Sequence, residues 1–409
     1  MGDYEVVTED RRREMAGECK NIRILPDARC CGCAACFNSC PVDAIEMKEN
    51  EDGFLYPSVK EEVCINCGKC VRACPELTPG YPNRKDPACY AAYGPDEIRM
   101  KSSSGGIFTL LAEAVLEKGG SVCGVVMDEN FSAEHRIINE KAGLEKMRGS
   151  KYIQSRIGTS YREIKKLLDE GKKVFFSGVP CQVAGLKGYL RKEYENLLTI
   201  DVVCHGVPSP GVFQKYRKET YGKELADFQF RTKEFGHNCN HCIATLKNGK
   251  RIVGNRENDA YERAFHTSLM LRSSCGECSF APTPRQGDLT LGDFWHIDKY
   301  NPEFPDAKGI SLVLVNSEKG ERAWENIRPR LQFCEPVPLE FTLKHNRFRS
   351  KIRIPEGRER FFEENRKQSF KKAVELASGQ KFSKKAAAKQ WLKRKLPSSV
   401  ITMVKKLRG

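Results

Sequence analysis

Eight cysteines near the start of the chain constrain the fold more than any other feature of the sequence. They form two runs with gaps of two, two and three residues, and each run is followed directly by proline. The runs are Cys30, Cys33, Cys36 and Cys40 before Pro41, and Cys64, Cys67, Cys70 and Cys74 before Pro75. A tight loop with two-residue gaps can turn three thiols toward one point, whereas the fourth must reach another. The spacing therefore predicts two groups of four thiols in a compact module.

This spacing is that of bacterial ferredoxins with two [4Fe-4S] clusters, in which the fourth cysteine of each run binds the other cluster. We therefore predict an α+β ferredoxin module over residues 21–80. One cluster is assigned to Cys30, Cys33, Cys36 and Cys74, and the other to Cys64, Cys67, Cys70 and Cys40. The alternative is a pair of zinc knuckles, because Cys-x2-Cys pairs also bind zinc. Cys31 is expected to be a thiol near the first cluster, since using it as a ligand would shorten the first gap.

Composition and the N-terminus indicate where the protein resides. Hydrophobic residues make up 40% and charged residues 30% of the chain, as in soluble globular proteins. No run approaches the roughly 20 apolar residues that a spanning helix needs. The first twenty residues are charged throughout and lack the apolar stretch of a secretion signal, so we expect a cytoplasmic protein. In that reducing compartment, 19 cysteines favour metal ligation over disulfides.

A proline-containing linker, TPGYPNRKDP, separates the module from a larger body. Beyond it, β-rich apolar runs alternate with helical patterns, which predicts an α/β body with a mainly parallel sheet over residues 88–340. Strands are expected at 89–94, 121–128, 172–179, 197–206, 227–232, 241–247, 288–294 and 310–315. Helices are expected at 105–119, 158–171, 181–190 and 260–274.

The loop SSSGG (residues 102–106) lies between a predicted strand and a predicted helix. Serines that cap a helix and glycines that let backbone N–H groups approach a ligand suit an anion site at a helix N-terminus. An ordinary helix cap is the alternative interpretation. The chain contains no G-x-G-x-x-G and no Gly-Lys-Ser/Thr motif, which argues against a Rossmann dinucleotide site and a P-loop.

Further motifs occur in a recognisable order. GSKYIQS (149–155), FFSGVPCQVAGLKGYL (175–190) and DVVCHGVPSP (201–210), with the 102–106 loop and the later CGEC and GDLTLGDFW, resemble the family of coenzyme F420 hydrogenase/dehydrogenase beta subunits. The resemblance covers roughly residues 88 to 340. It implies a flavoprotein that passes electrons between a two-electron organic carrier and iron–sulfur clusters, for which FAD is suited.

The same resemblance implies a set of flavin-binding residues. Ser104, Gly105 and Gly106 would approach the pyrophosphate, and Ser150, Lys151, Tyr152 and Gly178 would line the flavin pocket. The alternative for Lys151 and Tyr152 is a surface lysine beside a packed tyrosine.

Cysteines of the body suggest a third cluster. Family members are expected to have one beside the flavin, and Cys181, Cys204, Cys275 and Cys278 are its predicted ligands; buried inert thiols are the alternative. Cys239 and Cys242, with His237 and His241 nearby, offer a competing zinc site. His205 is a candidate proton donor, because its ordinary pKa is near neutrality. Asp293 and Trp295 in GDFW either face a substrate or pack a strand end.

Residues 341–409 are expected to form a basic, mostly helical tail appended to the body. They contain 21 Lys and Arg but 5 Asp and Glu, so the net charge of +15 resides there and the rest of the chain is near neutral. Val400, Met403, Val404 and Leu407 share one helical face, which suits peripheral contact with an anionic membrane. A docking arm for an acidic partner is the alternative. The neutral body argues against nucleic acid.

Three functions are consistent with these features. The leading one is an oxidoreductase that exchanges electrons between [4Fe-4S] clusters, FAD and an organic hydride carrier such as coenzyme F420, with ferredoxin as a redox partner protein. A reductase linked to surface-polysaccharide biosynthesis, acting on a small-molecule substrate, is a second. A non-catalytic electron-relay component of a larger complex is the third.

Overall fold

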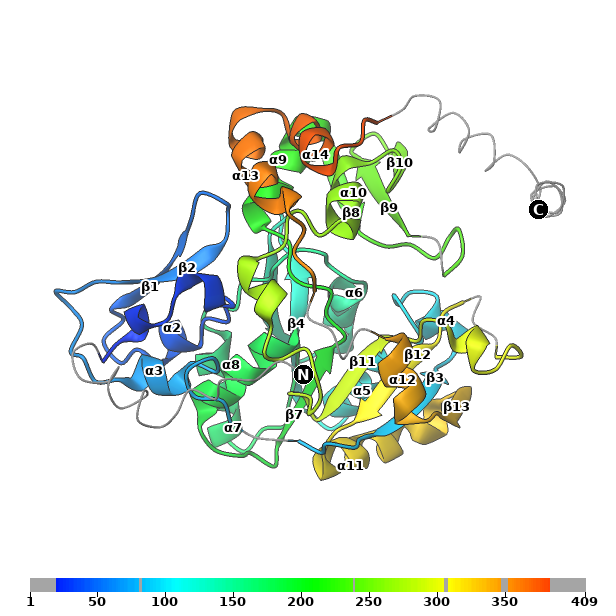
Figure 1. Ribbon diagram of the computed structural model, residues 1–409. Helices are drawn as coiled ribbons and strands as arrows, with labels where there is room; N and C mark the ends of the chain where they lie inside the picture. Colours follow the sequence, from blue (N-terminus) through cyan, green and yellow to red (C-terminus); the bar gives the residue numbers. More distant parts are fainter. Residues whose placement is uncertain (1–19, 81–82, 238–239, 305–307, 347–351, 383–409) are drawn as a thin grey trace, which may run out of the picture.

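The computed structural model describes residues 20–80, 83–237, 240–304, 308–346 and 352–382 (Figure 1). The N-terminal module contains an antiparallel pair, β1 (Ile45–Glu49) and β2 (Leu55–Val59). Each cysteine run contains a five-residue helix before its fourth cysteine. These helices are α2 (Ala35–Ser39) and α3 (Lys69–Ala73). Both helices start after a residue of positive φ and stop at the fourth cysteine of the run. The repeated spacing therefore produces a repeated backbone. Two 3-10 turns, Ile22–Ile24 and Asp27–Arg29, precede α2.

The body is built on an eight-stranded sheet in the order β13-β3-β12-β11-β7-β6-β4-β5. The four central strands, β11, β7, β6 and β4, are parallel to one another, whereas every outer pair is antiparallel. The centre of the sheet is therefore parallel, as predicted, whereas the complete sheet is mixed. The strands are β3 (Ala88–Tyr93), β4 (Ser121–Met127), β5 (Ala133–Ile138), β6 (Val174–Gly178), β7 (Leu197–Val202), β11 (Leu289–Asp293), β12 (Ser311–Val315) and β13 (Phe333–Pro336).

Helices cover both faces of this sheet. Successive side chains of a strand point to opposite faces, so apolar neighbours in one strand pack against different helices. Phe175 of β6 packs with α5 (Ile107–Leu116) and α11 (Glu318–Ile327). Phe176, the next residue, packs with α7 (Ser160–Asp169) and α8 (Pro180–Leu190). Shorter helices complete the layers: α4 (Asp96–Arg99), α6 (Leu144–Met147) and α12 (Leu339–His345).

A second core lies beside the large sheet. It is formed by the antiparallel sheet β10-β9-β8 and four helices (Figure 1). The strands are β8 (Leu225–Gln229), β9 (His241–Leu246) and β10 (Arg251–Asn255), and the helices are α9 (Pro210–Thr220), α10 (Ala260–His266), α13 (Gly357–Lys367) and α14 (Phe370–Ser378). The helix expected over 260–274 thus ends at His266, and Ser268 follows with a φ of 59°.

Residues 357–378 differ from the expected appended tail. Phe361, Phe362, Phe370 and Val374 are buried in the second core, so α13 and α14 belong to the body. Their apolar faces were obscured by the basic residues between them. The amphipathic segment with Val400, Met403, Val404 and Leu407 lies outside the described residues. None of the helices in the described part of the chain has the length and apolar character needed to cross a membrane.

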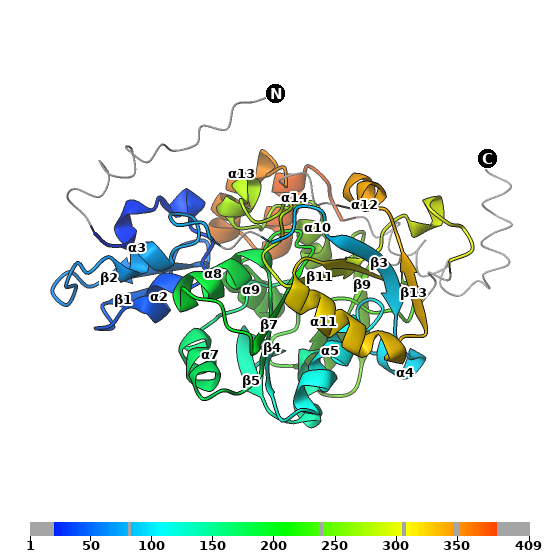
Figure 2. The ribbon, with the colours of Figure 1, turned by 90° about the horizontal axis from the view of Figure 1, so that it is seen from below.

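The N-terminal module lies against α8 of the body, as both views of the ribbon show (Figure 2). Two glycines of α8 make this close approach feasible. A Cβ on Gly185 would lie 2.9 Å from the sulfur of Cys33, and a Cβ on Gly188 would lie 2.4 Å from the carbonyl oxygen of Ala73. Cys33 and Ala73 of the module are therefore held directly against α8, whose second residue is Cys181.

Candidate functional site

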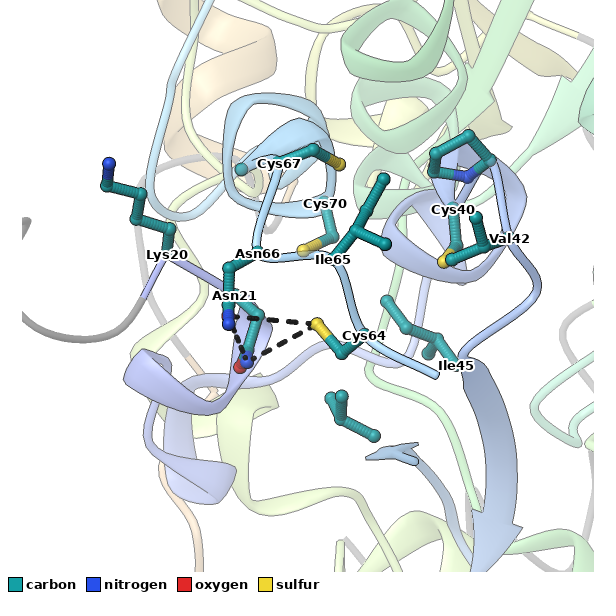
Figure 3. Close-up of a pocket in the computed structure, with 13 residues that line it drawn as sticks. Lys20, Asn21, Cys40, Val42, Ile45, Cys64, Ile65, Asn66, Cys67 and Cys70 are labelled. Carbon is teal, nitrogen blue, oxygen red and sulfur yellow. Dashed lines mark hydrogen bonds between the residues drawn. The ribbon is translucent and has the colours of Figure 1, made fainter. Parts of the chain in front are cut away.

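The second cysteine group encloses a small cavity. Cys40, Cys64, Cys67 and Cys70 line a cavity of about 20 Å³ (Figure 3). Cys40 reaches it from the end of α2, and the other three come from the loop after β2 and from α3. Apolar side chains, among them Val42 and Ile65, and the polar side chains of Asn21 and Asn66 form its remaining walls. These four cysteines are the set that the spacing assigns to one cubane.

N–H groups point at the sulfur atoms of this group. The amide of Ala44 donates to Cys40 Sγ at 3.2 Å, and Nδ2 of Asn21 donates to Cys64 Sγ at 3.7 Å. Hydrogen bonds to sulfur favour the thiolate and help to set the potential of a bound cluster. The donor set therefore fits an iron–sulfur cluster.

The first cysteine group, Cys30, Cys33, Cys36 and Cys74, is buried throughout. Burial raises the pKa of Cys36 well above its usual range, and Cys30 and Cys74 raise it further through their proximity. Cys74 thus crosses from the second run to the first group, which is the exchange that interleaved clusters require. Burial raises the pKa of Cys74 to about 12. Thiols in such surroundings ionise where a metal compensates their charge, and iron would supply that compensation.

The body cysteines also come together. Cys181 lies at the start of α8, Cys204 follows β7, and Cys275 and Cys278 lie in and after a 3-10 turn over Ser273–Glu277. The amide of Gly206 donates to Cys204 Sγ at 3.3 Å, and that of Val207 donates to Cys275 Sγ at 3.4 Å. Burial raises the pKa of Cys204 to about 11 and that of Cys275 to about 12. We call these four residues the body group.

Cys31 lies between the first group and the body group. Its thiol is buried and hydrogen-bonded to Cys181 and to Cys33, and both bonds lower its pKa. Its backbone carbonyl accepts a hydrogen bond from Nε2 of Gln154 at 3.0 Å. The sequence predicted a thiol near the first cluster, but no local pattern indicated the neighbour in α8, because Cys181 is remote in sequence.

The residues considered for a zinc site lie in different parts of the structure. Cys242 is buried in the second core, whereas His237 lies against Asp293 and stacks on Trp295. Cys239 lies outside the described residues. Across the described ranges, no three His, Cys, Asp or Glu side chains converge tightly enough to bind a single metal ion.

The 102–106 loop contacts one other predicted flavin segment, residues 149–155, and also the start of β12. Ser103 accepts hydrogen bonds from the amide and the hydroxyl of Ser150, at 2.8 and 2.9 Å. The hydroxyl of Ser104 donates to the carbonyl of Ile310 at 2.9 Å, and the Gly105 amide donates to Ser311 Oγ at 2.8 Å. Gly106, with a φ of 90°, begins α5. The loop and the GSKYIQS segment therefore form one continuous surface at the start of α5.

The other predicted flavin residues are embedded in the fold. Lys151 Nζ donates to the carbonyls of Lys146, Met147 and Arg148, each at 2.9 Å, and thereby caps α6. Burial lowers the pKa of Lys151 to about 7. Tyr152 stacks on Phe265 with ring centroids 4.3 Å apart. Gly178 is the last residue of β6.

A polar cluster that the sequence did not predict as a unit adjoins the 102–106 loop. Arg231 forms an ion pair with Asp293, whose other carboxylate oxygen lies 3.4 Å from His237 Nε2. Lys233 Nζ donates to the carbonyls of Arg99 and Ser104. Burial lowers the pKa of Lys233 to about 7, and Arg99 lowers it further. The side chain of Lys233 therefore contacts the loop, for which the sequence left open an anion site or an ordinary helix cap.

His205 lies near this region. Its Nε2 is 3.2 Å from the hydroxyl of Ser268, and its ring packs edge-on against Phe265 at 5.1 Å between centroids. Phe265 is also the stacking partner of Tyr152, so the candidate proton donor and a predicted flavin residue share one aromatic neighbour.

Family models match three consecutive parts of the chain. Residues 29–77 match a 4Fe-4S dicluster domain. Residues 89–159 match the N-terminal part, and residues 171–337 the C-terminal part, of the coenzyme F420 hydrogenase/dehydrogenase beta subunit.

Two curated relatives cover most of this chain. A component of the F(420)H(2) dehydrogenase of Methanosarcina mazei is 27% identical over 78% of this chain and 88% of its own length. The coenzyme F420-dependent sulfite reductase of Methanocaldococcus jannaschii is 24% identical over 82% of this chain and 52% of its own length, so this chain spans about half of that relative. A chain of the F420-reducing [NiFe] hydrogenase complex of Methanosarcina barkeri superposes with a TM-score of 0.43 and 18% identity, covering 63% of this chain and 83% of its own.

Proposed function

Because this chain belongs to the family of coenzyme F420 hydrogenase/dehydrogenase beta subunits, we propose that it is an iron–sulfur flavoprotein oxidoreductase. It transfers electrons between [4Fe-4S] clusters, FAD and an organic hydride carrier or substrate. The two cubanes of the ferredoxin module are bound by the first and second cysteine groups, and a third is bound by the body group.

The observation that carries this proposal is the succession of thiols from the module into the body. Cys67 of the second group is exposed to solvent. Cys36 of the first group lies within electrostatic range of Cys70 of the second. Cys31 then joins Cys33 to Cys181 of the body group. Such a row suits one-electron transfer between the surface and the interior of the molecule.

The surroundings of the second group support contact with a redox partner protein such as ferredoxin. Ile65 and Val63 are 61% and 39% exposed, and both neighbour the second cysteine run. Weak encounters between redox proteins use small interfaces, and these two side chains would contribute to one beside the cluster ligands. Electrons would enter or leave the chain at this surface.

The polar cluster beside the 102–106 loop supports an anionic cofactor such as FAD. Arg99 and Lys233 lie beside the loop, where Lys233 Nζ donates to the Ser104 carbonyl, and the start of α5 adds the favourable field of a helix N-terminus. When bound, FAD supplies the change from hydride to single-electron chemistry. Ser150, Lys151, Tyr152 and Gly178 then position the flavin, and His205 holds a proton near Phe265.

The names of the two curated relatives favour coenzyme F420 as the organic carrier. One observation favours the alternative of an electron relay without flavin: the Ser104 hydroxyl and the Gly105 amide already form hydrogen bonds within the protein. An FAD enzyme and a relay differ in flavin content and in their reaction with the carrier.

Acid extraction of anaerobically purified protein distinguishes the two. The enzyme releases FAD, and it oxidises reduced coenzyme F420 when an artificial one-electron acceptor is present. A protein that contains iron and sulfide but releases no flavin would be a relay, and the flavin assignment would then be wrong.

A further inference from the structure

A single arginine links the N-terminal module to the body. Arg272 is 0% exposed, and it lies three residues before Cys275 of the body group. Its Nε donates to the carbonyl of Cys30 at 2.6 Å, Nη1 to Oε1 of Gln154 at 3.1 Å, and Nη2 to the carbonyl of Leu55 at 3.1 Å. The guanidinium also lies over the ring of Tyr56, 4.0 Å from its centroid.

The backbone of the first cysteine run fits closely around this side chain. Gly32 has a φ of 69°, and a Cβ there would lie 2.9 Å from Nη1 of Arg272 and 2.7 Å from Nε2 of Gln154. Gln154 in turn donates to the carbonyl of Cys31. Arg272 and Gln154 therefore hold the Cys30–Gly32 segment from the body side.

The acceptors of Arg272 are all neutral. Among the described residues, no carboxylate forms an ion pair with it. A guanidinium remains charged in proteins, and a charge that is removed from water without a counter-charge is strongly unfavourable. This burial therefore requires negative charge from a source other than a carboxylate.

The cysteines on both sides of Arg272 can supply this charge. The guanidinium donates to the carbonyl of Cys30, and the backbone carbonyl of Arg272 accepts a hydrogen bond from the amide of Cys275 at 3.1 Å, so Arg272 lies between a cysteine of the module and a cysteine of the body. A cubane bound by four thiolates is a net anion, and it becomes one charge more negative when it accepts one electron. A buried cation close to it therefore favours the reduced state.

We propose that Arg272 is the electrostatic counter-charge of the first cluster and the body cluster, and that it raises the reduction potentials of both. This inference rests on the proposed function, because it presumes that the cysteine groups bind [4Fe-4S] clusters. The second group is partly exposed, and the guanidinium beside it, that of Arg72, is exposed to solvent and donates to the carbonyl of Cys67 at 3.1 Å. Arg272 therefore shifts the electron balance of the chain toward the two inner clusters.

The test is a redox titration of each cluster followed by electron paramagnetic resonance. In Arg272→Gln, the midpoint potentials of the first and body clusters should fall, whereas that of the second cluster should stay unchanged. We expect the one-electron partition between the inner and outer clusters to change at least tenfold, which corresponds to about 59 mV. Iron and sulfide per chain should equal those of the unmodified protein.

Arg162→Gln is the matched control. Arg162 also donates to carbonyls of the first run, at Asn38 (3.0 Å), Phe37 (3.0 Å) and Cys40 (3.3 Å). Unlike Arg272, it is 33% exposed and pairs with Asp43 at 2.7 Å. Its charge is screened and compensated, so this variant should leave all cluster potentials unchanged.

Arg272→Lys separates charge from geometry. This variant keeps the positive charge but cannot form all three hydrogen bonds of the guanidinium. It should therefore retain the clusters, and their midpoint potentials should fall less than in Arg272→Gln. Unchanged potentials in Arg272→Gln with full iron content would overturn the inference. Loss of the clusters from both Arg272→Gln and Arg272→Lys would also overturn it, because the role of Arg272 would then be to maintain the structure of the site. Absence of iron and sulfide from the unmodified protein would instead contradict the proposed function.

Discussion

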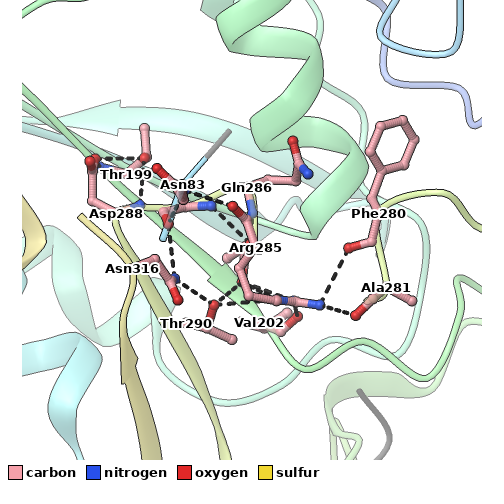
Figure 4. A network of polar contacts seen from close by, with 12 residues as sticks. Asn83, Thr199, Val202, Phe280, Ala281, Arg285, Gln286, Asp288, Thr290 and Asn316 are labelled. Atoms are coloured by element: carbon pink, nitrogen blue, oxygen red, sulfur yellow. Dashed lines mark hydrogen bonds and ion pairs between the residues drawn. The ribbon is translucent and has the colours of Figure 1, made fainter. Parts of the chain in front are cut away.

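Arg285 and Arg272 are both deeply buried, yet their surroundings differ. Arg285 pairs with Asp201 at 2.9 Å inside a network of polar side chains from the central strands (Figure 4). Asp201 also accepts hydrogen bonds from the amides of Gln286 and Gly287 and from the hydroxyl of Thr290. Arg272, at the junction with the module, has only neutral acceptors. The charge of Arg285 is thus neutralised by a side chain of the body, whereas that of Arg272 depends on what the cysteines bind.

Loss of a ligand at the cysteine groups should have the largest effect. Cys67→Ser is expected to remove about four iron atoms per chain, the content of one [4Fe-4S] cluster, together with part of the visible absorbance. FAD should remain bound, because the flavin segments lie in the body. Iron analysis, absorbance and flavin extraction measure these outcomes.

Cys334→Ser is the control, since Cys334 belongs to none of the three groups. It should retain all iron. Equal iron loss in both variants would show that the losses reflect general destabilisation, and loss of FAD from Cys67→Ser would contradict the division between module and body.

Asp201→Asn should have the next largest effect, because it leaves Arg285 charged, buried and without its counter-charge. We expect the free energy of unfolding to fall by about 3–5 kcal/mol, the usual result of removing one partner of a buried ion pair. Arg322→Gln breaks an exposed pair with Glu195 and should cost less than about 1 kcal/mol. Denaturant unfolding of both variants measures this difference. Equal effects would show that the Asp201 network does not neutralise Arg285.

The fit between the module and α8 should be sensitive to one methyl group. Gly188→Ala brings a Cβ to within 2.4 Å of the Ala73 carbonyl, and such overpacking typically costs about 1–3 kcal/mol. We expect the module to separate from α8 more readily, which limited proteolysis of the 78–87 linker detects. In Gly80→Ala, where a Cβ meets nothing within 4 Å, cleavage should match that of the unmodified chain. Unaltered cleavage of Gly188→Ala would contradict this interface.

A smaller effect is expected from pH. Burial lowers the pKa of His135 to about 4, whereas the unfolded chain has the ordinary value of 6.5. Between these values the unfolded state binds more protons than the folded state, so the free energy of unfolding falls as the pH falls from about 6.5 toward 4. His135→Gln should make this dependence shallower, and the exposed His296→Gln should not. Urea unfolding across that range measures the slopes, and identical slopes would argue against a neutral buried imidazole.

The sequence predicted the parts of the site that depend on local spacing. The two cysteine runs define the first and second groups because a loop of fixed gaps needs little tertiary context. The body group followed from a family resemblance, since Cys181 and Cys275 are joined only by the folded sheet. Arg272 could not be predicted, because Cys30, its hydrogen-bond partner, is 242 residues away in the sequence.

The fold shows the same division. Alternating strands and helices predicted an α/β body, but they did not predict the antiparallel outer strands. β5 turns back on β4 through a short connection, whereas β13 pairs with β3, which is remote in sequence. Basic residues between Phe361 and Val374 suggested a solvated tail, whereas their aromatic face completes the second core. Charge composition thus concealed the periodicity that determines burial.

The central claim is that three groups of four cysteines bind three [4Fe-4S] clusters in one chain. Iron and acid-labile sulfide, measured per chain on oxygen-free protein alongside the electron paramagnetic resonance of the reduced state, test it most directly. The account predicts about twelve iron atoms and twelve sulfides, four of each per cluster, with interacting signals of reduced cubanes. Colourless protein that contains zinc in place of iron and sulfide would contradict it.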